Sequence, residues 1–158
     1  QKNSFFIYYT SPESFTLFRA FYNNDFGIQD KYVDFWKHTA DRLSGNKYVA
    51  GFDPFNEPLP SWKGIMSLIY EVLPGHMDKN ELAPMYERLY EKYQAADADN
   101  IMMFEPAQFP DEIPNVVFPL KGFTKPPGGE IGSPYHVLND HTYCCQLNPS
   151  ICSETGEP

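Results

Sequence analysis

The sequence predicts an α/β fold built on a parallel sheet. Three short apolar runs have the length and composition of buried strands, and segments with helical periodicity precede the first two. Strands that alternate with helices usually pair in parallel. In addition, each predicted strand is followed directly by polar residues that can take part in chemistry, as is usual at the carboxyl edge of such a sheet.

The 158 residues suffice for one ordinary domain, and their composition excludes some functions. The net charge is −9 and no basic run occurs, which argues against nucleic-acid binding. No stretch reaches the 18 apolar residues expected of a membrane span. Aromatic residues make up 16% of the chain, which suits a heavy core or a site that stacks sugars and lipid chains.

The first third of the chain divides into an aromatic segment and a helix. Residues 1–27 contain many Phe and Tyr side chains without a clean period, which predicts a long packed loop with short helical pieces. From Ile28 to Leu43 apolar residues recur at three and four positions, and Ser44-Gly45-Asn46 follows. This pattern predicts a helix that ends at the glycine.

Three strands and one further helix complete the predicted order. Residues 48–52 are an apolar run typical of a strand buried on both faces. A helix is expected over 82–96, capped by Asp78 or Asn80, and strands over 101–104 and 135–138.

The polar strand ends point to the kind of sheet. They carry Asn56 and Glu57, then Glu105, then His141 and Tyr143. In (β/α)8 barrels chemistry occurs at this edge, and one strand-helix unit takes about 30 residues. The chain therefore predicts three or four units of a TIM barrel with long βα loops. A doubly wound sheet is the alternative, but no glycine-rich phosphate turn follows any strand.

The segment Gly51-Phe52-Asp53-Pro54-Phe55-Asn56-Glu57-Pro58 is the most informative motif. A glutamate at a strand exit can protonate a departing glycosidic oxygen, and an adjacent amide can bind a sugar hydroxyl. Pro54 cannot donate to the strand ladder, which predicts a bulge there. Asn-Glu-Pro alone is also compatible with a simple capped turn, but its place after a buried strand and a Trp-bearing helix favours a sugar-cleaving site.

Residues 28–58 resemble glycoside hydrolase family 5, in which a helix of the type Asp-Lys-Tyr-Val-Asp-Phe-Trp (30–36) precedes the strand that carries Asn-Glu-Pro. The aromatic segment 15–27 and the strand exits 104–106 and 141–143 are similar to the endoglycoceramidase branch of that family. The resemblance covers nearly the whole chain, with the motifs in the right order.

The resemblance implies a role for each site residue. Glu57 would be the general acid/base, and Asn56 would hold the sugar. His141 and Tyr143 would lie on the sixth barrel strand, with the tyrosine orienting the nucleophile. The family nucleophile is a glutamate after the seventh strand, expected beyond Pro158. Residues 1–158 would then be the central part of one barrel, roughly strands four to six, with strands one to three and seven and eight outside the chain.

The implied activity is that of a retaining glycosidase that cleaves the β-glycosidic bond between an oligosaccharide and ceramide in glycosphingolipids. A β-glucosidase or endoglucanase acting on soluble glycans is one alternative, and a catalytically silent sugar- or lipid-binding fragment is another. No cofactor is expected. A zinc site is not expected either, because no second cluster of Cys and His lies at ligand spacing.

Two acidic residues leave alternatives open. Glu105 is the other glutamate at a strand exit, and a retaining enzyme needs two carboxyl groups about 5–5.5 Å apart. The family pattern disfavours it as nucleophile, which leaves substrate binding, support of a residue that binds substrate, or a structural hydrogen bond. Asp140 either fixes the tautomer of His141 or is simply exposed.

The remaining features concern substrate and compartment. Ile65, Leu68, Ile69 and Val72 fit an amphipathic helix after Trp62. Together with residues 1–27 it would form an apolar flank for ceramide chains or membrane contact, or it would simply pack on the barrel. Three cysteines are also clustered, Cys144, Cys145 and Cys152. They favour a disulfide. Together with the implied activity on glycolipids, they favour a secreted or lysosome-like compartment. Three free thiols in a reducing compartment are the alternative.

Overall fold

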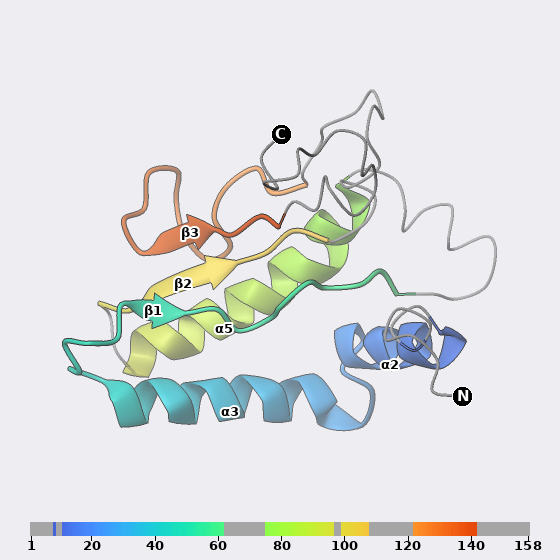
Figure 1. The fold of residues 1–158 in the computed structure, drawn as a ribbon, viewed down its shortest axis with the longest axis horizontal. Coiled ribbons are helices and arrows are strands. Elements are labelled where there is room, and N and C mark those ends of the chain that lie inside the picture. Colours follow the sequence, from blue (N-terminus) through green and yellow to red (C-terminus); the bar gives the residue numbers. More distant parts are fainter. Residues whose placement is uncertain (1–7, 9–10, 62–74, 97–98, 108–121, 142–158) are drawn as a thin grey trace, which may run out of the picture.

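A computed structural model describes residues 8, 11–61, 75–96, 99–107 and 122–141 (Figure 1). Within them, β1 (Gly51–Phe52), β2 (Ile101–Phe104) and β3 (His136–Leu138) form one sheet in the order β1-β2-β3. Both pairings are parallel, with Gly51 opposite Ile101 and Met102 opposite His136. The predicted parallel sheet is confirmed, although β1 is shorter than the apolar run 48–52.

The two predicted helices are confirmed almost to the residue. Helix α3 spans Ile28–Leu43, and Gly45 follows it with φ +71°, a conformation that favours glycine. Helix α5 spans Ala83–Ala96 and is preceded by a π-helical turn, η2 (Asp78–Leu82). The predicted cap was wrong for both candidates, which lie inside η2: the carboxylate of Asp78 accepts hydrogen bonds from the N–H groups of Ala107 and Gly122, and the amide of Asn80 donates to the carbonyl oxygen of His76.

The aromatic segment contains more regular structure than predicted. Helix α2 spans Pro12–Tyr22, and a short 3-10 turn, η1 (Asp25–Gly27), joins it to α3. The Ser11 side chain accepts a hydrogen bond from the N–H of Ser14, so Ser11 is the N-cap, and Pro12 opens the helix. Residues 1–27 were predicted to be a long packed loop with short helical pieces. A helical piece is present, but over 12–22 it is longer than predicted, and the spacing of Phe15, Phe18 and Tyr22 there is helical.

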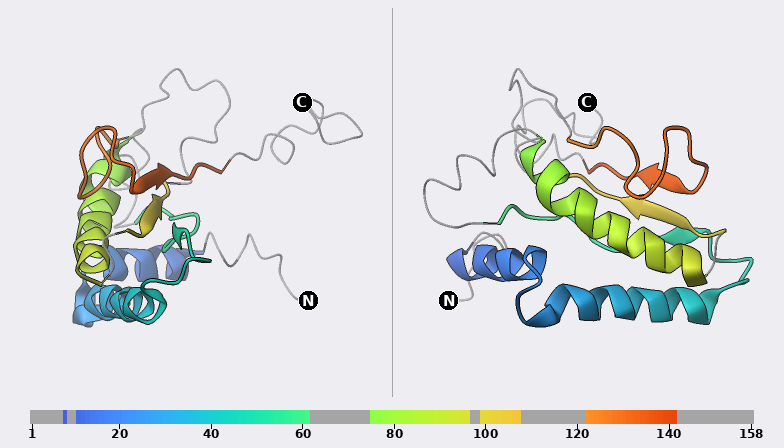
Figure 2. Two further views of the ribbon diagram at one scale, coloured as in Figure 1. Left: turned by 90° about the vertical axis from the view of Figure 1, so that its left-hand side faces the viewer. Right: turned by 180° about the vertical axis from the view of Figure 1, so that it is seen from behind.

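The described helices α3 and α5 pack side by side, and both lie on the same face of the sheet (Figures 1 and 2). Helix α5 connects β1 to β2, whereas α3 precedes β1. Helices that stay on one face of a parallel sheet are typical of a (β/α)8 barrel, whereas a doubly wound sheet carries helices on both faces. The core between helices and sheet is formed by buried apolar side chains, chiefly Val33, Ala40, Phe52, Met85, Leu89, Tyr93 and Met102.

Gly51 is required where β1 meets β2. A Cβ atom at this position would lie 2.3 Å from the carbonyl oxygen of Ile101 and 2.8 Å from the Ile101 Cβ. Only glycine allows the two strands to approach this closely. This contact sets the position of the chain that leaves β1 toward Glu57.

The chain after β1 does not form the predicted bulge. Strand pairing ends at Phe52, so Pro54 lies beyond the ladder and its missing N–H breaks no sheet hydrogen bond. The predicted amphipathic helix at 65–72, Tyr143 and the three cysteines all lie outside the described residues. Among the helices that are described, none has both the length and the apolar character needed to cross a bilayer.

Candidate active site

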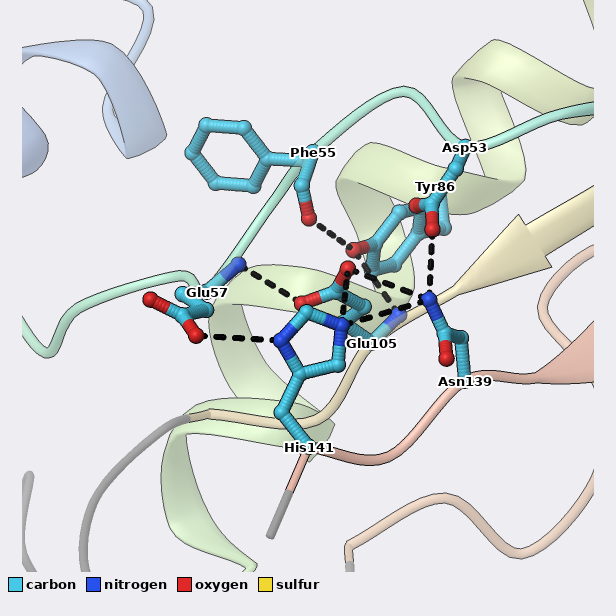
Figure 3. Close-up of polar contacts among 7 residues, drawn as sticks. All are labelled: Asp53, Phe55, Glu57, Tyr86, Glu105, Asn139 and His141. Carbon is cyan, nitrogen blue, oxygen red and sulfur yellow. Dashed lines mark hydrogen bonds and ion pairs between the residues drawn. The ribbon is translucent and has the colours of Figure 1, made fainter. Parts of the chain in front are cut away.

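Five polar side chains gather where the three strands end (Figure 3). Asp53 and Glu57 follow β1, Glu105 follows β2, and Asn139 and His141 follow β3. Because parallel strands end at a common edge, side chains separated by 84 positions come into direct contact there. The sheet thus brings together Glu57, Glu105 and His141, three of the residues singled out from the sequence.

Glu57 and His141 are both partly exposed and form a contacting pair in this cluster. The Oε1 atom of Glu57 lies 3.0 Å from Nδ1 of His141, and their side chains are 20% and 25% exposed. The hydrogen bond to Glu57 is the main cause of a raised pKa at His141, and the charges of Glu105 and Asp53 act in the same direction. An accessible carboxyl group held against an imidazole is suited to proton transfer with a bound ligand.

Three tyrosines from three helices hold the chain around Glu57. The hydroxyl of Tyr32 (α3) donates to the carbonyl oxygen of Pro54, and that of Tyr86 (α5) donates to that of Phe55 at 3.4 Å. Tyr22 (α2) donates to the carbonyl oxygen of Leu59 at 2.9 Å. These tyrosines satisfy carbonyl groups of an irregular segment that lacks sheet partners.

Aromatic packing reinforces the same segment. The ring of Phe55 lies 5.2 Å from that of Phe21 and 5.9 Å from that of Tyr32, measured between centroids. Phe21 also meets Tyr32 edge-on at 5.0 Å. The aromatic residues of α2 therefore pack against the segment that bears the acid, which gives a structural reason for the aromatic content near the N-terminus.

Glu105 lies beneath this pair and is only 2% exposed. Its Oε2 accepts a hydrogen bond of 2.6 Å from the N–H of Glu57, and its Oε1 lies 3.4 Å from Nε2 of His141. Burial raises the pKa of Glu105, and the bond from the Glu57 N–H opposes that shift. A carboxyl group so enclosed faces the protein rather than the surface that a substrate would contact, which does not fit the predicted substrate contact.

Asp53 and Asn139 belong to the site, although no role was predicted for them. The Nδ2 atom of Asn139 donates to Oδ2 of Asp53 at 2.6 Å and lies 3.4 Å from Oε1 of Glu105. Both residues occupy the first position after a strand. The rule that singled out Glu105 as the first residue after its strand would have found them as well.

Two of the remaining predicted residues, Asn56 and Asp140, are described by the structure, and one, Tyr143, is not. Asn56 is exposed beside Glu57, where a ligand could reach its amide. Asp140 is exposed next to His141, which was one of the two alternatives, and Tyr143 lies outside the described residues. Within the described ranges no group of three or more His, Cys, Asp or Glu side chains has the arrangement of a metal site.

The sequence profile of the cellulase family (glycosyl hydrolase family 5) matches residues 9–144. The chain therefore belongs to glycoside hydrolase family 5, in agreement with the resemblance drawn from residues 28–58. This confirms the family and, together with the parallel sheet and its one-sided helices, the prediction of part of a TIM barrel.

Within that family the chain is similar to endoglycoceramidases. It is 30% identical to the endoglycoceramidase of Cyanea nozakii and 29% identical to that of Hydra vulgaris, in each case over 142 residues. These matches cover 90% of the chain but 26% of either relative, so the chain spans about a quarter of the length of the relatives that it matches.

Solved structures of endo-glycoceramidase II from Rhodococcus sp. share the fold. The complex with ganglioside GM3 matches 98% of the chain and 32% of its own length, with a TM-score of 0.71 and 22% identity. The lactosyl-enzyme intermediate matches 90% of the chain and 31% of its own length, with a TM-score of 0.69 and 22% identity.

Proposed function

We propose that this chain carries the general acid/base of a retaining endoglycoceramidase, with Glu57 in that role. The observation that supports the proposal best is the 3.0 Å contact between Glu57 and His141 at the carboxyl edge of the sheet. The similarity to endoglycoceramidases over 90% of the chain supports the substrate class. The substrate would be a glycosphingolipid, cleaved between its oligosaccharide and ceramide.

The reaction would proceed in two steps. A second glutamate, expected beyond Pro158, attacks the anomeric carbon; the bond from that carbon to the ceramide oxygen breaks, and this oxygen takes the proton of Glu57. The Glu57 carboxylate then removes a proton from water, whose oxygen attacks the same carbon and displaces the nucleophile. The oligosaccharide leaves with retained configuration.

The roles of the neighbouring residues follow from their places. The exposed amide of Asn56 would bind a sugar hydroxyl, and Tyr143 would orient the nucleophile, as the family resemblance implies. The raised pKa of His141 means that the imidazole holds a proton more readily than a free histidine, so it can donate to Glu57 once that carboxylate forms.

The test of Glu57 depends on the leaving group. A ceramide alkoxide is a poor leaving group and needs protonation, whereas dinitrophenolate does not. In the full-length protein that contains this chain, Glu57→Gln should lower kcat/KM for ganglioside GM3 by about 10²- to 10⁴-fold. The loss of kcat/KM for a dinitrophenyl lactoside should be much smaller, and equal losses would contradict the assignment.

A glucan-cleaving activity is the second candidate, and the cellulase description of the matching family favours it. The same protein, incubated in parallel with ganglioside GM3 and with soluble cellulose oligomers, separates the two candidates by its products. Release of lactose-based oligosaccharide and ceramide supports the proposed function. Release of cello-oligosaccharides alone supports the second candidate.

We further propose a secreted or lysosome-like compartment for this activity. The support comes from the sequence, in which Cys144, Cys145 and Cys152 are close enough to form a disulfide under oxidising conditions. We also propose that the amphipathic segment with Ile65, Leu68, Ile69 and Val72, which follows Trp62, forms an apolar flank for lipid chains together with residues 1–27.

A further inference from the structure

The two-step reaction leaves one buried acid without a role. Glu105 carries a fully buried carboxyl group next to Glu57, and the N–H of Glu105 is itself bonded to the Tyr86 hydroxyl at 3.1 Å. Burying a carboxyl group is unfavourable unless its oxygens find donors. The partners that Glu105 has acquired therefore indicate what it does.

One oxygen of Glu105 holds the backbone of the acid. Oε2 accepts the N–H of Glu57 at 2.6 Å, a short distance typical of a charge-assisted bond. Glu57 has φ +47°, in the left-handed region that residues other than glycine and asparagine rarely adopt. Because this conformation sets the direction of the Cα–Cβ bond, the contact with Glu105 helps to aim the Glu57 side chain.

The other oxygen of Glu105 contacts His141, the residue that faces the Glu57 side chain. Oε1 lies 3.4 Å from Nε2 of His141, whose Nδ1 lies 3.0 Å from Glu57. The ring is thus placed between two carboxyl groups, the buried one of Glu105 and the partly exposed one of Glu57 (Figure 3). Nε2 also lies 3.4 Å from Nδ2 of Asn139.

This arrangement gives His141 a partner in both charge states. A protonated ring donates from Nδ1 to Glu57 and from Nε2 to Glu105. A neutral ring that keeps its proton on Nδ1 still donates to Glu57, while Nε2 accepts from Asn139. The charged groups that act on the ring are Glu57 and Asp53 from the chain after β1 and Glu105 from the chain after β2, all acidic.

We propose that Glu105 is a positioning residue for the acid/base Glu57: one carboxylate oxygen fixes the Glu57 backbone, and the other supports the protonated His141 ring that faces the Glu57 side chain. The inference rests on the proposed function of Glu57. It assigns to Glu105 no contact with the substrate, only the geometry and the charge that proton transfer requires.

Two variants of Glu105 separate its two contacts. In Glu105→Gln the amide oxygen can still accept a hydrogen bond from the Glu57 N–H. The amide nitrogen that replaces Oε1, however, cannot accept a hydrogen bond from Nε2–H of His141. In Glu105→Ala both contacts are lost. Both variants should lower kcat/KM for ganglioside GM3, with about a 10²-fold loss for the alanine variant and a smaller loss for the glutamine variant.

Asp78 provides a matched control. It is also 2% exposed, and its carboxylate also accepts backbone N–H groups, those of Ala107 at 2.7 Å and Gly122 at 2.9 Å. Asp78→Asn makes the same change from carboxylate to amide in a buried side chain, but the backbone groups that this side chain binds do not belong to the segment that bears Glu57. It should lower the melting temperature and change kcat/KM by the same factor for every substrate.

The deciding measurement is kcat/KM in the full-length protein, for ganglioside GM3 and for dinitrophenyl lactoside, with folding verified by thermal unfolding. The proposal expects both Glu105 variants to lose much more on the glycolipid than on the dinitrophenyl substrate. It also expects Glu105→Gln to lower the pKa at which His141 titrates, followed by NMR of histidine-labelled protein. Folded Glu105 variants that lose equally on both substrates, as Asp78→Asn should, would overturn it.

Glu57→Gln measured beside these variants keeps the two hypotheses apart. If Glu57→Gln itself shows no dependence on the leaving group, the proposed function fails and the inference about Glu105 fails with it. If Glu57→Gln shows the dependence and the folded Glu105 variants do not, only the positioning role is refuted.

Discussion

The hydroxyl of Tyr86 offers a sharp test of how the site is held together. Tyr86 is fully buried; its hydroxyl accepts the N–H of Glu105 at 3.1 Å and donates to the carbonyl oxygen of Phe55 at 3.4 Å. Burial raises its pKa well above 10, so the hydroxyl keeps its proton and can donate. Tyr86→Phe removes only this oxygen and leaves the ring packed against Phe104 and Phe123.

The expected cost of Tyr86→Phe comes mainly from one orphaned donor. A buried N–H without its acceptor costs about 1–3 kcal/mol, and the longer bond to Phe55 contributes at the low end of hydrogen-bond energies. We therefore expect the free energy of unfolding of the full-length protein to fall by about 1–3 kcal/mol. Equilibrium urea unfolding at fixed pH measures this change.

Tyr93 supplies the control for the same substitution. It is 1% exposed and also lies on α5, but its hydroxyl has no hydrogen-bond partner among the residues that the structure describes. Tyr93→Phe removes a buried polar atom that gains nothing from its surroundings, so stability should stay the same or rise. If Tyr93→Phe destabilises the protein as much as Tyr86→Phe, the reasoning from hydrogen-bond partners is refuted.

Two further predictions concern the sheet and the buried acid. Gly51→Ala should destabilise the protein by about 1–3 kcal/mol or more, because the new Cβ would press on the Ile101 carbonyl at 2.3 Å; urea unfolding that matches the wild type would contradict this close approach. The pKa values of Glu105 and His141 are both raised above their ordinary 4.5 and 6.5, so the folded state binds more protons and stability should fall as pH rises above those values. Glu105→Gln should flatten this decline above pH 4.5, as seen by thermal unfolding at several pH values; an unchanged slope would show that these groups do not cause it.

The predictable parts of the fold are those that depend on local pattern. Helix α3 follows from its apolar spacing and the glycine after it, and β2 from a compact apolar run between polar residues. The extent of helix α2 was missed because the aromatic residues of 1–27, taken together, show no clean period, although Phe15, Phe18 and Tyr22 within 12–22 are spaced as on one helix face. Its Ser11-Pro12 start was the clearer signal.

The site was predictable in its location but not in its internal connections. Parallel strands bring their carboxyl ends together, so Glu57, Glu105 and His141 were expected near one another. That Glu105 would bond the N–H of Glu57 depends on strand register and on a left-handed backbone at Glu57. Neither the register nor the left-handed backbone can be predicted from the sequence, because a glutamate followed by a proline does not indicate a positive φ.

The three tyrosine tethers on residues 54–59 have a consequence for ligand capture. Each tether crosses from a different helix to one carbonyl of the segment that bears Glu57. The entropy of ordering this segment is thus lost during folding and need not be lost again when a ligand arrives. Under the proposed function, a glycolipid would bind to a Glu57 segment that is already ordered, and its binding energy would remain available for distorting the sugar ring.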